Sequence, residues 1–177
     1  MTAKKPEPFS RRELLFGFMD RIRGRDRAET APTGLDSGLA KADEVFAQGK
    51  WSEALEAYRD SLSTSPLNDE ARVRVGICFY RLEKHTQAMT ELKAVLRKRP
   101  HNLASLYLGL THARRGELDK TLAAWKAYFD PGRVALMREV NLQCACIEEG
   151  HEVDSGEVAR AVENALEADR KSVADTA

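Results

Sequence analysis

From residue 38 onward, apolar side chains recur every three or four positions along the chain. Polar or turn-forming residues interrupt this pattern at intervals of roughly 12 to 18 positions, a spacing that predicts a series of amphipathic α-helices. Ala, Leu, Glu, Arg and Lys dominate the composition and β-branched runs are scarce, which also favours helices over strands. The sequence therefore predicts an all-α protein.

The pattern divides the chain into four regions. We predict a basic amphipathic segment over residues 1–24, a linker over 25–37, a helical domain over 38–171 and a disordered tail over 172–177. The linker is rich in charged and turn-forming residues, and the helical pattern begins directly after it.

An internal repeat organises the helical domain. Ala54 and Ala88 are 34 positions apart, and Thr121 follows Ala88 after 33. Pro66 and Pro100 are also separated by 34 positions, and each ends its unit because proline cannot continue a helix interior. Self-similarity at this period predicts stacked helix pairs in which no unit buries its apolar face alone.

These units, about 35–68, 69–101 and 102–134, resemble the tetratricopeptide repeat. The resemblance implies a right-handed stack of antiparallel helix pairs, with small residues where the helices of a pair meet and bulky residues between pairs. The small positions are Ala42, Ala54, Gly76, Ala88 and Gly109, and the bulky ones are Tyr58, Leu92 and Trp125. The sequence departs from the family pattern at Lys41-Ala42, where Leu-Gly is usual, at Glu83, which stands at a turn glycine, and at Thr121, which replaces alanine.

Two further helices are expected after Pro131-Gly132, over residues 133–148 and 157–170. We interpret this pair as a C-terminal cap, with a degenerate fourth repeat as the alternative. Its polar residues, among them Glu163 and Asp169, are expected to face solvent, as the end of such a stack requires.

The resemblance also implies a concave groove lined by the first helix of each repeat. Carried over by repeat position, the candidate groove residues are Phe46, Arg74, Ile77, Tyr80, Arg81, Leu103, Tyr107 and Arg114. An apolar and aromatic surface edged by arginines suits a partner peptide or helix with apolar and acidic residues. Simple packing between helices is the alternative for the apolar members, and a solvated face is the alternative for the arginines.

The N-terminal segment is the second candidate site. Its candidate docking residues are Arg11, Arg12, Leu14, Leu15, Phe18, Met19 and Ile22. Residues 1–27 carry eight basic and four acidic groups, and a basic amphipathic helix can lie on an anionic membrane surface. Docking into a partner, pairing of two copies, folding back onto the repeats and a disordered tail are the alternatives. Arg11-Arg12 also resembles a twin-arginine export motif, but Asp20-Arg21 interrupts the apolar stretch that export requires.

The sequence shows no signature of catalysis, cofactor binding or metal binding, and we expect none of these activities. It contains no phosphate-binding loop after a strand, no nucleophile elbow and no paired metal-ligand histidines. Lys plus Arg equals Asp plus Glu at 28 each, whereas a nucleic-acid-binding domain normally carries a basic surplus. Three cysteines without paired spacing favour a reducing, cytoplasmic environment, with association to a membrane surface left open.

Together these features predict a non-catalytic scaffold whose groove holds a peptide or helix of a protein partner during assembly or maturation of a complex. One alternative is a small cytosolic chaperone for secreted substrates, similar to the three-repeat chaperones of type III secretion, which pair as homodimers. Another is a peripheral membrane scaffold that attaches through residues 9–24.

Overall fold

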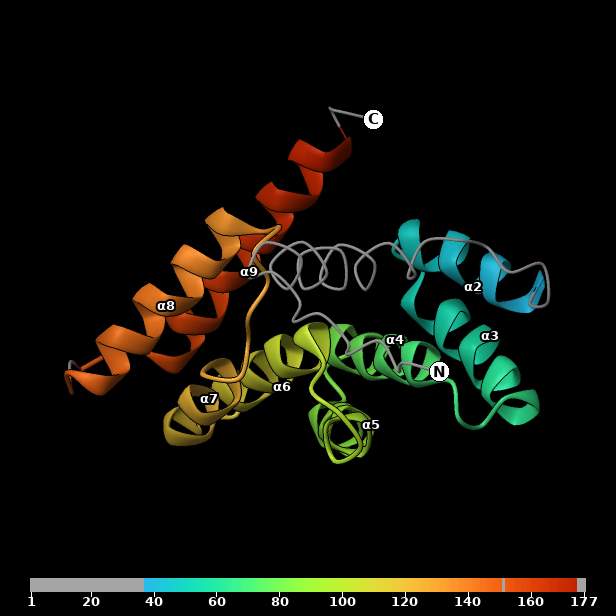
Figure 1. Ribbon diagram of the computed structural model, residues 1–177, viewed down its shortest axis with the longest axis horizontal. Helices are drawn as coiled ribbons and strands as arrows, with labels where there is room; N and C mark the ends of the chain where they lie inside the picture. The colour runs from blue at the N-terminus through green and yellow to red at the C-terminus, as the bar shows by residue number, and fades with distance from the viewer. Residues whose placement is uncertain (1–36, 151, 175–177) are drawn as a thin grey trace, which may run out of the picture. The chain divides into compact units, whose positions relative to one another are not determined.

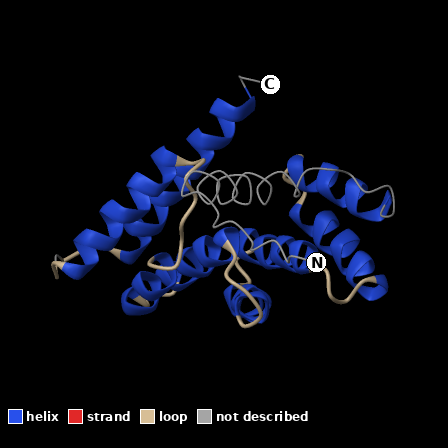
Figure 2. Cartoon of the chain, in the orientation of Figure 1, coloured by secondary structure: helices blue, strands red, loops and turns tan. Residues whose placement is uncertain are grey.

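A computed structural model describes residues 37–150 and 152–174, and within these ranges the chain forms eight helices and no strand (Figures 1 and 2). The helices are α2 (Ser37–Ala47), α3 (Trp51–Thr64), α4 (Asp69–Arg81), α5 (His85–Leu96), α6 (Asn102–Arg114), α7 (Leu118–Trp125), α8 (Val134–Glu148) and α9 (Ser155–Ala174). The predicted all-α architecture is confirmed. The predicted N-terminal helix falls outside the described residues.

Consecutive helices pack against one another from α2 to α9, so α2/α3, α4/α5 and α6/α7 form three helix pairs. The inner helices α4 and α6 of neighbouring pairs are also in contact. The core runs continuously through all the pairs, which is how a repeat stack buries apolar faces that a single pair would leave exposed.

Two glycines set the distance between the helices of the second and third pairs. A Cβ atom at Gly109 would lie 2.2 Å from Nε1 of Trp125, and one at Gly76 would lie 2.8 Å from Cδ2 of Leu92. The Trp125 ring is only 1% exposed, and its Nε1 donates a 3.0 Å hydrogen bond to the Leu106 carbonyl. The small residues therefore lie where the helices of a pair meet, as predicted. The bulky Leu92 and Trp125 contact these glycines within the same pair, whereas the sequence predicted them between one pair and the next.

The turns and caps between helices follow local sequence rules. The backbone adopts positive φ at Gly49 (75°), Glu83 (58°) and Gly116 (75°), the position that ends the first helix of each pair. Asn68 caps α4, as its side-chain oxygen accepts a 3.1 Å hydrogen bond from the Ala71 amide. Asp154 does the same ahead of α9, where it accepts a 2.9 Å bond from the Glu157 amide.

The fourth pair, α8 and α9, docks in the reverse order. Helix α7 packs on α8, but it is α9, the second helix of the pair, that packs on α6. Its apolar stripe of Val158, Ala159, Val162 and Leu166 is buried there. Helix α9 is longer than expected at both ends, and residues 172–174 lie within it although the sequence predicted a disordered tail over 172–177.

The expectation that Glu163 and Asp169 face solvent is wrong. Their side chains are only 16% and 11% exposed, and each pairs with an arginine. Glu163 reaches Arg114 of α6, and Asp169 lies 3.5 Å from Arg133, just ahead of α8. Because α9 packs on α6 through its apolar stripe, the polar residues that flank this stripe also contact other parts of the protein. These two carboxylates therefore belong to the docking contact.

Gly109→Ala should lower the free energy of unfolding by about 2 kcal/mol in urea denaturation, because the rigid Trp125 ring cannot yield without losing its hydrogen bond. Gly76→Ala is the matched control, and we expect a smaller loss because the Leu92 side chain can change rotamer. An unchanged or increased stability for Gly109→Ala would contradict this account of the helix contact.

Glu83→Gly should stabilise the protein by about 0.5–1 kcal/mol, since an L-residue with a side chain is strained at positive φ and glycine is not. The reciprocal change at the equivalent turn, Gly116→Ala, should destabilise by a similar amount. Thermal or urea unfolding of the two variants measures both changes in stability. If Glu83→Gly is destabilised, the interactions of the glutamate side chain stabilise the protein by more than the strained backbone destabilises it.

Candidate functional site

A hollow of about 420 Å³ lies among the inner helices α2, α4 and α6, the segment that precedes α8, and helix α9. We call it the inner hollow. Its lining residues are Asp43, Phe46, Ala47, Arg74, Ile77, Leu103, Tyr107, Arg133, Leu166 and Arg170. The first helix of every repeat and the C-terminal pair therefore contribute to one surface.

The apolar part of the inner hollow comes from all three repeats and from α9. Ile77, Tyr107 and Leu166 belong to the core and present only a small exposed area. Phe46 and Leu103 are partly buried and offer more of their side chains. An apolar side chain of a ligand would find contacts here without displacing the core.

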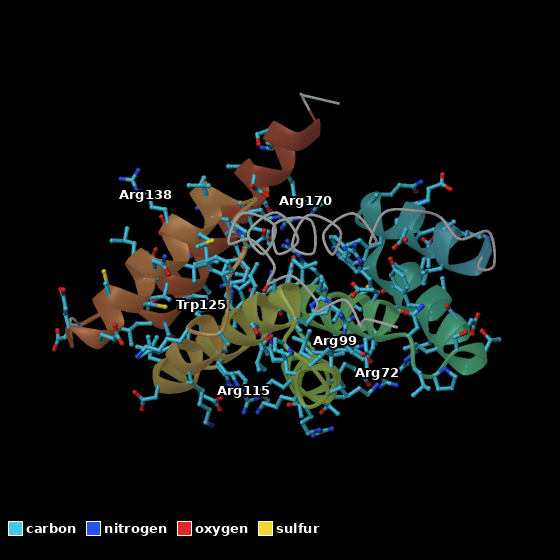
Figure 3. All side chains as sticks on the ribbon, viewed as in Figure 1. Arg72, Arg99, Arg115, Trp125, Arg138 and Arg170 are labelled. Atoms are coloured by element: carbon cyan, nitrogen blue, oxygen red, sulfur yellow. The ribbon has the colours of Figure 1, made fainter. Side chains whose placement is uncertain are left out.

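Arginines surround this apolar surface. The Arg74 guanidinium lies 4.9 Å from the centroid of the Phe46 ring, a cation–π arrangement that holds it over the hollow. Arg133 is engaged by Asp130 at 3.6 Å and Asp169 at 3.5 Å. Arg170 extends from α9 and is exposed (Figure 3). Within residues 37–150 and 152–174, neither Arg74 nor Arg170 has a carboxylate at ion-pair distance.

Asp43, the one carboxylate among the described residues that line the inner hollow, is already in a hydrogen bond. It accepts from the hydroxyl of Tyr58, a fully buried residue of α3. Burial and the neighbouring Asp43 carboxylate raise the pKa of Tyr58, so the phenol stays protonated and remains the donor. The inner hollow therefore has a positive excess, with two arginines available to a ligand.

A second, smaller hollow of about 240 Å³ lies at the ends of α4 and α6. We call it the polar hollow, and Tyr80, Arg81, Glu83, His85, Arg114 and Glu163 line it. Glu163 accepts from the Tyr80 hydroxyl and pairs with Arg114. Burial and Glu163 raise the pKa of Tyr80, while the hydrogen bond to Glu163 raises the pKa of Arg114. These shifts keep a neutral phenol and a charged guanidinium on the same carboxylate.

Two nitrogens in the polar hollow are buried without a hydrogen-bond partner among the described residues. They are Nε of Arg81 and Nδ1 of His85. The Arg81 guanidinium lies 5.6 Å from the centroid of the Trp51 ring. Burial lowers the pKa of His85, so its imidazole is neutral at pH 7.

The eight predicted groove residues fall into these two hollows. Five line the inner hollow, namely Phe46, Arg74, Ile77, Leu103 and Tyr107, and three line the polar hollow, namely Tyr80, Arg81 and Arg114. The Tyr80 and Tyr107 rings meet edge to face at 5.5 Å between centroids and join the two. That these residues bind a partner remains a prediction. The seven candidate residues of the N-terminal segment lie outside the described residues.

Sequence reasoning missed the contribution of the C-terminal pair. Arg133, Leu166 and Arg170 line the inner hollow, and Glu163 occupies the polar hollow. A signal was present in α9, whose acidic residues flank its apolar stripe on more than one side, but the repeat pattern alone places the second helix of a pair away from the groove.

A profile of the tetratricopeptide repeat matches residues 39–102 and 84–133, which is more than half of the chain. The chain therefore belongs to the tetratricopeptide-repeat family. Proteins of this family mediate protein–protein interactions and are typically non-catalytic scaffolds. No helix in the described part of the chain is both long and apolar enough to cross a membrane.

The matching relatives are larger proteins. BBSome complex member BBS4 of Mus musculus is 26% identical over 117 residues, which are 65% of this chain and 22% of that protein. Tetratricopeptide repeat protein 1 of Schizosaccharomyces pombe is 31% identical over 74 residues, 41% of this chain and 7% of that protein. The CTR9 homolog of Arabidopsis thaliana is 32% identical over 79 residues, 44% of this chain and 7% of that protein. The chain thus spans about a fifth or less of the length of these relatives.

Glu163→Gln should loosen the docking of α9 on the inner helices, because the amide cannot serve both Tyr80 and Arg114 as the carboxylate does. We expect a loss of about 1–3 kcal/mol in the free energy of unfolding, together with faster amide hydrogen exchange in α9. Glu167→Gln, an exposed position one turn further along α9, is the matched control. Equal effects of the two changes would show that Glu163 does not hold the helix.

Proposed function

We propose that this protein is a non-catalytic scaffold that binds a peptide or helix of another protein in the inner hollow. The observation that carries this proposal is the combination of an apolar surface with two arginines, Arg74 and Arg170, that lack a carboxylate partner among the described residues. The apolar side chains of a ligand segment would bury this apolar surface, and an acidic residue of the same segment would pair with the arginines.

The relatives support a role in multiprotein assembly. One of them is a member of the BBSome complex by name. We infer that this chain likewise acts within a complex, where it holds one component during assembly or maturation. Residues 1–27, with eight basic and four acidic groups, suit this surface less well than an acidic segment does, because their net positive charge is repelled by the arginines.

The test compares two arginines of the C-terminal helix pair. Arg170 of α9 lines the inner hollow, whereas Arg138 of α8 is exposed and does not line it (Figure 3). Neither has a carboxylate at ion-pair distance among the described residues. Arg170→Glu and Arg138→Glu therefore change the net charge equally, at positions that differ in their relation to the hollow.

The intact chain and both variants would serve as baits in lysate of the native host, with bound proteins quantified by mass spectrometry. We expect a stoichiometric partner whose recovery falls about tenfold with Arg170→Glu, which corresponds to about 1.4 kcal/mol, and is unchanged with Arg138→Glu. Arg74→Glu should reproduce the loss. Equal recovery on all baits would refute binding at the inner hollow.

A further inference from the structure

A third hollow lies on the opposite side of α6. It has a volume of about 500 Å³ and runs between α5 and α7, with α6 as its floor. Leu96 and Pro100 form one wall, Ser105 and Leu108 lie on the floor, and alanines of α7, including Ala124, form the other wall. We call it the outer furrow. The α6 residues that line the outer furrow lie on the face of the helix opposite Leu103 and Tyr107, which line the inner hollow.

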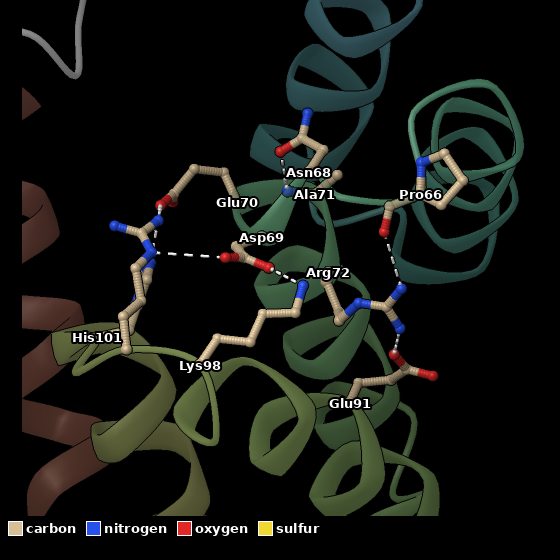
Figure 4. A network of polar contacts seen from close by, with 10 residues as sticks. Pro66, Asn68, Asp69, Glu70, Ala71, Arg72, Glu91, Lys98 and His101 are labelled. Carbon is tan, nitrogen blue, oxygen red and sulfur yellow. Dashed lines mark hydrogen bonds and ion pairs between the residues drawn. The ribbon is translucent and has the colours of Figure 1, made fainter.

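The corresponding position between the first and second repeats is built differently. The repeat spacing places Arg72 where the third repeat has Ser105, and Glu91 where it has Ala124. The Arg72 guanidinium donates to the Pro66 carbonyl at 3.2 Å and to Glu91 at 2.8 Å (Figure 4). This arginine bridges the two walls, one from the loop after α3 and the other from α5.

The outer furrow therefore reflects two substitutions between repeats that share a backbone plan. Ser105 and Ala124 are too short to span the walls, so the space that Arg72 and Glu91 fill stays open one repeat later. If such a gap were a general feature of the repeat backbone, it would also be open between the first and second repeats. There, the bridge formed by Arg72 occupies the corresponding space. The opening is a property of this sequence at this position.

The outer furrow is apolar inside and positively charged at its edges. Lys93 of α5 and Lys120 of α7 lie on its two rims and are exposed. The nearby carboxylate of Glu117 is already engaged by Nδ1 of His112 at 2.5 Å and by Lys120 at 3.4 Å. Burial, with Lys93 and Lys120 nearby, lowers the pKa of His112 despite the Glu117 hydrogen bond. The positive charges of both lysines thus reach the His112 imidazole on the floor of the furrow.

We propose that the outer furrow is a second protein-docking surface, which binds an amphipathic partner segment by its apolar side chains and pairs Lys93 and Lys120 with acidic residues of that segment. Charge complementarity selects this occupant, because both rims are cationic. Lys93 has no carboxylate at ion-pair distance among the described residues, and Lys120 shares the Glu117 carboxylate with His112 and Arg115. This surface is separate from the inner hollow, so the protein would hold two segments at once, on opposite sides of α6.

The test uses the full chain and a panel of helical peptides of about 14 residues, each with a stripe of leucines and glutamates on the other face. A second panel carries lysine in place of glutamate. Two-dimensional NMR of the ¹⁵N-labelled protein reports which amides respond. We expect the glutamate peptides to shift the amides of Leu96, Leu108 and Ala124, and the lysine peptides to bind at least tenfold more weakly at these residues.

Ser105→Arg with Ala124→Glu transplants the arginine bridge of the preceding repeat into the outer furrow. This variant should fold with unchanged helicity and lose the response at Leu96 and Leu108 at least tenfold. Lys93→Glu with Lys120→Glu should instead reverse the preference, so that the lysine peptides bind more tightly than the glutamate peptides. Arg170→Glu, which tests the inner hollow, should leave the furrow response unchanged, so the two proposals fail independently.

Three results with the peptides would overturn the proposal. The glutamate peptides fail to shift the furrow amides, or they shift them equally in the bridged variant, or the charge-reversed variant keeps its preference for glutamate. A concentration-dependent dimer that the bridge abolishes, measured by sedimentation, would also overturn it by assigning the outer furrow to a second copy of the chain.

Discussion

The close contact of Gly109 with Trp125 is the constraint on which the rest of this stack depends. With no Cβ between them, α6 lies against the indole ring, and the ring in turn donates a hydrogen bond to the α6 backbone. Gly76 and Leu92 repeat the arrangement one pair earlier with a softer side chain. Because both glycines fix the inner helices against their outer partners, α4 and α6 contact each other, and their remaining faces are left to form the inner hollow and the outer furrow.

Helix α9 limits the groove that the repeats would otherwise leave open. It packs on α6 through a buried apolar stripe, and Glu163 adds a polar anchor to Tyr80 and Arg114. Three predicted groove residues thus lie in a polar hollow that contains a carboxylate of the protein itself. The space available to a ligand shifts toward Phe46 and Arg74, where Arg170 adds a cation from the same helix that closes the other end.

The sequence was sufficient to predict the repeats, the small positions where the helices of a pair meet and the cap at Asn68, because these depend on local rules and on a period that recurs. It was insufficient for the fourth pair. The docking of α9 on α6 depends on which of two amphipathic helices fits the last repeat better, and Glu163 becomes an inward residue only after that choice is made. The outer furrow could not be predicted for a related reason. Neither Ser105 nor Ala124 indicates an open surface by itself. The gap that they leave is recognised only when the third repeat is compared with the Arg72–Glu91 bridge of the second.

The distribution of charge connects the two candidate surfaces. The chain has equal numbers of acidic and basic residues, yet the inner hollow and the outer furrow both expose more cations than carboxylates. The carboxylates that lie close to them are used internally, Asp43 by Tyr58 and Glu117 by His112. Under both proposals a neutral chain selects acidic partners on the two sides of α6, since selection depends on the charges exposed at each surface and not on the net charge.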